Sequence, residues 1–95
     1  MDSKIMHNHF RFLMNSKWAG RQNHEDCLEY FFKDKRVMDW ICIFIPLNTN
    51  GEISWKYFSG TKALDSSRGD KIKRTPHWFQ QLVEKAQNKL NEINV

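Results

Sequence analysis

Cysteine is scarce in this sequence of 95 residues, and the only two, Cys27 and Cys42, stand inside apolar runs. A secreted domain of this size usually carries a framework of several cysteines, so we expect both thiols to be reduced and buried. The N-terminal stretch has an acid at position 2 and lacks the apolar segment of a signal peptide. These features favour an intracellular protein, cytoplasmic or nuclear.

Long hydrophobic runs are also missing. The longest, "WICIFIPL" at positions 40–47, has eight residues, far fewer than the roughly 20 that a membrane helix needs. The sequence also lacks a catalytic motif. The polar stretch 60–78 does not have the Gly-Lys-Ser/Thr ending of a phosphate loop. Cys27 has His24 on the same predicted helical turn, but neither cysteine lies in the electropositive, partly exposed setting that lowers a thiol pKa. The sequence therefore predicts no membrane contact and favours a protein that is not an enzyme.

One set of side chains has the right types for a zinc site: His7, His9, His24 and Cys27. Against this reading, the paired cysteines of strong zinc signatures are absent, and Cys27 fits the apolar stripe of a helix. The sequence leaves this metal set open, and we predict no cofactor.

Large rings and positive charge are abundant. Aromatic residues make up 14% of the chain, with four Trp and seven Phe, so a single domain spanning residues 1–95 can bury an adequate core. The formal net charge of +4 suits an anionic partner, such as nucleic acid or an acidic protein surface.

The spacing of apolar residues predicts three helices. Over 6–18 they recur on one helical face, although Phe10, Phe12 and Met14 also alternate as in a strand. A second helix is predicted from Asn23 as its cap to the basic run 33–36, with Cys27, Leu28 and Phe31 buried. The last helix has Thr75 as its cap, Pro76 at its first position and this apolar stripe: Phe79, Leu82, Val83, Ala86, Leu90, Ile93.

Residues 36–60 predict a β-hairpin, because β-branched and aromatic residues flank "NTNG". With a tight turn at Asn50-Gly51, Thr49 pairs with Glu52 and Phe44 faces Tyr57. One face of the hairpin would then carry Trp40, Cys42, Phe44, Trp55 and Tyr57. The predicted fold is a small α+β domain: two N-terminal helices, a central antiparallel β-hairpin, a long basic loop at 60–75 and a C-terminal amphipathic helix.

Basic residues gather in two places. The loop 60–75 carries Lys62, Arg68, Lys71, Lys73 and Arg74, and a second cluster, Lys33, Lys35 and Arg36, precedes the hairpin. Such cations can follow a phosphate backbone, while exposed rings beside them, with Trp55, Tyr57 and Trp78 as candidates, can stack on bases. The sequence thus predicts a small non-enzymatic nucleic-acid-binding domain acting mainly through phosphate contacts, and it does not separate DNA from RNA.

Two other interpretations stay open. The loop is also typical of a solvated connector, with the rings in the core. Alternatively, the hairpin is apolar on both faces, and an uncovered face would suit a protein-interaction module or inhibitor, of the kind that viruses and mobile elements encode, or a homodimer.

Overall fold

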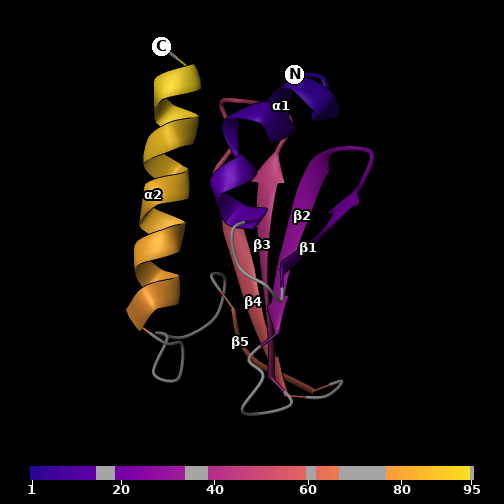
Figure 1. Ribbon diagram of the computed structural model, residues 1–95, viewed down its shortest axis with the longest axis vertical. Helices are drawn as coiled ribbons and strands as arrows, with labels where there is room; N and C mark the ends of the chain where they lie inside the picture. Colours follow the sequence, from indigo (N-terminus) through magenta and orange to yellow (C-terminus); the bar gives the residue numbers. More distant parts are fainter. Residues whose placement is uncertain (15–18, 34–38, 60–61, 67–76, 95) are drawn as a thin grey trace.

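The computed structural model describes residues 1–14, 19–33, 39–59, 62–66 and 77–94. Its elements follow one another along the chain in this order: α1 (Ser3–His9), a 3-10 turn η1 (Arg11–Met14), β1 (Ala19–Asn23), β2 (Cys27–Lys33), β3 (Asp39–Pro46), β4 (Ser54–Ser59), β5 (Lys62–Ser66) and α2 (His77–Ile93). Figure 1 shows the two helices beside the sheet. The prediction of a small α+β domain is confirmed.

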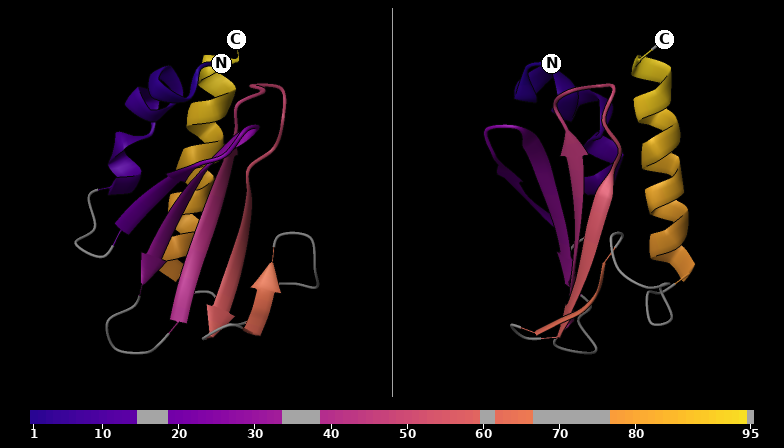
Figure 2. Two further views of the ribbon diagram at one scale, coloured as in Figure 1. Left: turned by 90° about the vertical axis from the view of Figure 1, so that its right-hand side faces the viewer. Right: turned by 180° about the vertical axis from the view of Figure 1, so that it is seen from behind.

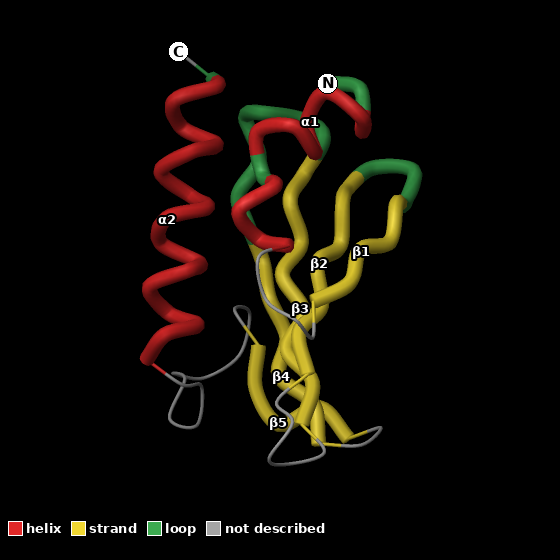
Figure 3. Tube along the Cα trace, in the orientation of Figure 1, coloured by secondary structure: helices red, strands yellow, loops and turns green. Residues whose placement is uncertain are grey.

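The five strands form one sheet in the order β1-β2-β3-β4-β5, and every neighbouring pair is antiparallel. Each strand therefore pairs with the next one in the chain, as the tube in Figure 3 shows. A sheet of this kind needs only hairpin connections.

Both helices lie against the same face of the sheet (Figure 2). On that face three residues of β2 lie opposite three isoleucines of β3: Leu28 opposite Ile45, Tyr30 opposite Ile43, and Phe32 opposite Ile41. Two residues of β4 extend these rows, with Trp55 opposite Ile43 and Tyr57 opposite Ile41. The helical layer completes the core with Met6, Phe10, Leu13, Phe79, Ala86 and Leu90. Because side chains alternate along a strand, the intervening residues point to the other face, which none of the described helices covers.

The first predicted helix is confirmed in part. It begins at Ser3, where Asp2 Oδ1 caps it by accepting hydrogen bonds from the backbone N–H of Lys4 (2.8 Å) and Ile5 (3.3 Å). The helix ends at His9, and η1 continues the same apolar face through Leu13. Residues 15–18 lie outside the described part of the chain.

The second predicted helix is wrong, because residues 19–33 form the β1–β2 hairpin. In β2 the burial alternates strictly, with Leu28, Tyr30 and Phe32 buried and their neighbours half-buried. Alternation over seven residues is the strand period, and it outweighs the helical spacing of the predicted stripe. The turn is closed by His24 N–H, which donates to the Cys27 carbonyl at 2.9 Å.

The β3–β4 hairpin is confirmed, but its register differs from the prediction. Phe44 lies opposite Ser54 rather than Tyr57. The connection between Pro46 and Ser54 includes a turn closed by Gly51 N–H donating to the Asn48 carbonyl at 2.9 Å, and Gly51 does not adopt the positive φ that a tight hairpin turn requires. The register moves by three residues, an odd number, so the β4 side chains change faces relative to those of β3.

The C-terminal helix is confirmed as α2, with Phe79, Ala86 and Leu90 fully buried. It also binds the preceding hairpin, because Gln87 Oε1 accepts a hydrogen bond from the Ile53 N–H at 3.1 Å. The predicted loop 60–75 needs a correction: its first part, Lys62–Ser66, is strand β5 and pairs with β4 through a register shift at Tyr57/Phe58. Residues 67–76 lie outside the described ranges.

Candidate functional site

Two of the predicted base-stacking rings are in the core. Trp55 is 5% exposed and Tyr57 is 8% exposed, and both point toward the helical layer. The Trp55 ring lies 6.0 Å from the ring of Phe79 on α2. The prediction that Trp55 and Tyr57 are exposed beside the basic loop is therefore wrong, because the hairpin register turns both rings inward.

The predicted cations have different positions. Lys33 ends β2 on the face opposite the helices, and Lys62 begins β5. The remaining six, Lys35, Arg36, Arg68, Lys71, Lys73 and Arg74, lie outside the described residues. Their role stays a prediction.

The face opposite the helices carries a group of rings that we call the open-face cluster: Phe31 on β2 with Trp40 and Phe44 on β3. All three are half-buried. The rings of Phe31 and Trp40 are 6.2 Å apart at an angle of 59°. Cys42, which lies opposite Phe31 in the register, is only 8% exposed. Phe31 and Trp40 therefore pack on each other, and Phe44 lies further along the same face of β3, with no described helix above them.

Two lysines lie over these rings. Lys33 Nζ is 5.5 Å from the centre of the Trp40 ring, and Lys56 Nζ is 5.9 Å from the centre of the Phe44 ring. Contacts of this kind are worth about 0.5–1 kcal/mol at exposed sites. Among the residues whose side chains the structure describes, neither ammonium lies within ion-pairing distance of a carboxylate. Within that set, no ion pair has to break before either cation binds an external anion.

One acid that the structure describes on this face, Glu29, is already engaged. Its Oε1 lies 2.7 Å from His24 Nε2. Burial, together with Glu29, raises the pKa of Cys42 to about 12, and burial with Asp26 and Glu29 nearby raises the pKa of Cys27. Neither thiol has the lowered pKa of a nucleophile.

Phe31 rests on glycine. A Cβ built at Gly20 would lie 2.2 Å from Cε2 and 2.3 Å from Cζ of the Phe31 ring. The ring therefore occupies the space that a side chain at position 20 would take on the neighbouring strand β1. Glycine at this position lets the ring lie close against the sheet.

The residues of the proposed zinc set are engaged in separate contacts. His7 Nδ1 lies 2.8 Å from the Tyr30 hydroxyl, whereas His24 pairs with Glu29. Within the described ranges, no three His, Cys, Asp or Glu side chains converge as metal ligands.

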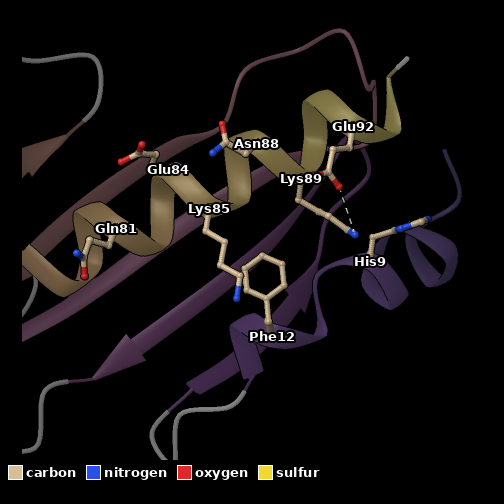
Figure 4. Close-up of a pocket in the computed structure, with 8 residues that line it drawn as sticks. All are labelled: His9, Phe12, Gln81, Glu84, Lys85, Asn88, Lys89 and Glu92. Carbon is tan, nitrogen blue, oxygen red and sulfur yellow. Dashed lines mark ion pairs between the residues drawn. The ribbon is translucent and has the colours of Figure 1, made fainter.

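A hollow lies between the helices, and Figure 4 shows the residues that line it. Its volume is about 570 Å³, and its wall consists of His9, Phe12, Gln81, Glu84, Lys85, Asn88, Lys89 and Glu92. Lys85 Nζ sits 4.6 Å above the Phe12 ring, and Lys89 Nζ is 3.6 Å from Glu92. Two lysines face two glutamates here, so this groove does not single out an anionic ligand.

Sequence reasoning missed four site residues: Phe31, Trp40, Phe44 and Lys56. The available signal was the alternation of residues 27–33, which puts Phe31 and Lys33 on the face opposite Tyr30. Comparison of the chain with family models, with curated proteins and with solved structures gives no match in any of the three. Among the described helices, none has the length and apolar character to cross a membrane.

Proposed function

We propose that this protein is a small non-enzymatic nucleic-acid-binding domain that uses the open face of its sheet. The observation that carries the proposal is the pair of ammonium groups, Lys33 and Lys56, held over aromatic rings on a face that no described helix covers. Cations provide phosphate contacts, and rings provide surfaces for bases.

The charge of the whole chain supports this proposal. The net charge is +4, and one acid that the structure describes on the open face is paired with a histidine. In the sequence, Lys35 and Arg36 follow Lys33 after one acid, Asp34. Four cations of the basic loop, Arg68, Lys71, Lys73 and Arg74, follow β5. The proposal includes phosphate contacts from these residues, with DNA and RNA both as candidate ligands.

The test is the salt dependence of binding to a labelled oligonucleotide. A protein that contacts several phosphates loses affinity steeply as salt rises, with a slope close to the number of contacts. The double variant Lys33→Gln/Lys56→Gln should weaken binding and reduce this slope by about two. The matched control, Lys85→Gln/Lys89→Gln, removes the same charge from α2 and should leave the slope unchanged. Absence of binding at low salt, or equal effects of both double variants, would refute the proposal.

The rival function is a protein-interaction module or a homodimer built on the same face. It is favoured by the uncovered open-face cluster, since apolar surface without cover often marks an interface. Light scattering distinguishes the two functions. A dimer that becomes a monomer in a Phe44→Lys variant would support the rival, whereas a monomer at all concentrations would count against the homodimer.

A further inference from the structure

We propose that the ligand of the open face is single-stranded nucleic acid, with one base stacked on Trp40 and another on Phe44. This inference rests on the proposed function and specifies the form of nucleic acid. In a duplex the bases already stack on one another, so protein rings can stack only on bases that are unstacked.

The width of the sheet argues against binding inside a duplex groove. Five strands at about 4.8 Å per step span roughly 19 Å from β1 to β5. The major groove is about 12 Å wide and admits a helix or a two-stranded ribbon. The open-face cluster lies on β2 and β3, in the interior of the sheet, with β1 and β4 on either side, so these rings cannot reach base edges in a groove.

The exposed side of α2 is not suited to binding in a groove of a nucleic-acid duplex. Between His77 and Ile93 it carries two lysines, Lys85 and Lys89, and two glutamates, Glu84 and Glu92. A helix that enters a groove passes close to phosphates on both sides and needs an excess of cations. The equal charges on α2 leave the open face as the better surface for a polyanion.

Trp40 and Phe44 define two separate stacking positions. They lie four residues apart on the same face of β3, which corresponds to about 13 Å at roughly 3.3 Å per residue. One base cannot cover both rings. Each ring has its own lysine, Lys33 over Trp40 and Lys56 over Phe44, so each position pairs a stacking surface with a phosphate contact.

In the free protein, the two lysines cover the faces of the rings. In the absence of ligand, each ammonium occupies the space above its ring, where it gains a weak cation–π contact. A phosphate offers the ammonium a stronger, charge-assisted partner. We expect the lysine side chain to move to the phosphate and the base to take its place over the ring.

The surface beneath these positions is fixed. Phe31 lies close against Gly20 on one side and contacts Trp40 on the other, and Cys42 fills the space opposite Phe31 at 8% exposure. The Trp40 ring is therefore held by packing against Phe31, which reduces the ordering cost of binding at this position.

The test compares a single DNA strand of about 15 nucleotides, which is near the upper end of known site sizes, with an RNA of the same sequence and with the DNA duplex. Binding is measured by fluorescence anisotropy at low salt. The variants are Trp40→Leu, which removes the ring, Trp40→Phe, which keeps one, and Phe12→Leu, which removes a half-buried ring from the helical side of the molecule.

The proposal expects tighter binding of a single strand than of the duplex. Trp40→Leu should lose roughly five- to a hundredfold in single-strand affinity, while its duplex affinity and the single-strand affinity of Phe12→Leu stay near wild type. Trp40→Phe should keep most of its affinity but lose the part of the tryptophan quenching that ligand causes at position 40, a change that a purely structural role would not produce. DNA and RNA strands bound equally would indicate stacking without sugar recognition, and a preference would identify the natural strand.

Two outcomes would overturn the inference. If Trp40→Leu binds single strands as tightly as wild type while Lys33→Gln/Lys56→Gln still weakens binding, the stacking positions are refuted and the nucleic-acid function stands. If the wild-type protein binds neither strand nor duplex, the proposed function fails and this inference fails with it. Should Trp40→Leu not fold, Phe44→Leu provides the same comparison at the second position.

Discussion

Because the Phe31 ring lies so close to Gly20, we expect the effect of Gly20→Ala on stability to depend on whether Phe31 is present. The three atoms nearest to a Cβ at position 20 all belong to the Phe31 ring, at 2.2, 2.3 and 3.1 Å. Real Cβ atoms essentially never approach a heavy atom below 3.0 Å, so the ring must move. The backbone of Gly20 does not adopt a positive φ, so alanine itself fits the strand conformation.

The magnitude follows from two opposing effects. Overpacking of this kind costs about 1–3 kcal/mol, because Phe31 must leave its place against β1 and lose contact with Trp40. Alanine in place of glycine, at a compatible backbone position, returns about 0.4–1 kcal/mol by restricting the unfolded chain. We therefore expect Gly20→Ala to lower the free energy of unfolding by about 1–2 kcal/mol.

A double-mutant cycle with Phe31→Ala isolates the steric contact. Once the ring is removed, Gly20→Ala should become stabilising by about 0.4–1 kcal/mol, so that the coupling energy is about 1–3 kcal/mol. Thermal unfolding followed by circular dichroism resolves this, since 1 kcal/mol shifts the midpoint by about 4–8 °C in a domain of this size. If Gly20→Ala destabilises the Phe31→Ala protein as much as the wild type, the cost comes from the backbone and the contact with the ring is not its cause.

Two further predictions concern the other layer of the molecule. Phe79→Ala should lower the free energy of unfolding by about 3–5 kcal/mol, because Phe79 is fully buried. Leu82→Ala should lower it by less than about 2 kcal/mol, because Leu82 is half-buried at the edge of α2. Equal losses for the two variants in urea unfolding would contradict the packing of α2. Burial and the nearby Arg21 guanidinium lower the pKa of His7 below 6.5, so the folded state favours the neutral ring. The contribution of His7 to the free energy of unfolding is therefore complete above pH 6.5 and is lost as the pH falls through the lowered pKa. His7→Gln should remove this part of the pH dependence, and identical profiles for both proteins between pH 7 and pH 5 would refute the assignment.

The elements that the sequence predicts correctly are those whose local signals agree with their surroundings. The α2 stripe repeats at the helical period and starts after Pro76, and the structure buries Phe79, Ala86 and Leu90 on that stripe. The β3–β4 hairpin has β-branched and aromatic residues on both sides of a polar turn. The helix is marked by its period and the hairpin by its composition and its turn, so in neither case do local signals for a different structure compete.

The β1–β2 hairpin could not be predicted because its signals conflict. Cys27, Leu28 and Phe31 fit one helical face, while Leu28, Tyr30 and Phe32 fit one strand face. A short apolar run is compatible with both periods, and neighbouring strands decide between them. Here β3 supplies seven residues of pairing to β2, which a lone helix at this place would leave unused.

The misplaced site residues follow from register. A tight turn at Asn50-Gly51 predicts that the β4 rings share a face with Trp40 and Phe44, whereas the longer connection shifts pairing by three residues and buries Trp55 beneath α2. An odd shift exchanges the two faces of a strand, so the local composition of the hairpin is unchanged while its exposed rings become different ones.

What survives this exchange is the chemistry of the surface rather than the identity of its residues. The sequence predicts a basic protein with rings among its cations, and the structure has that combination on the face away from the helices, where Lys33 and Lys56 lie over Trp40 and Phe44. Because side chains alternate along β2 and β3, the rings of the open face and the core row of Ile41, Ile43 and Ile45 lie on opposite sides of the same two strands. Both helices pack against the core row, so the sheet is stabilised from that side while the rings on the other side lie without cover from a described helix.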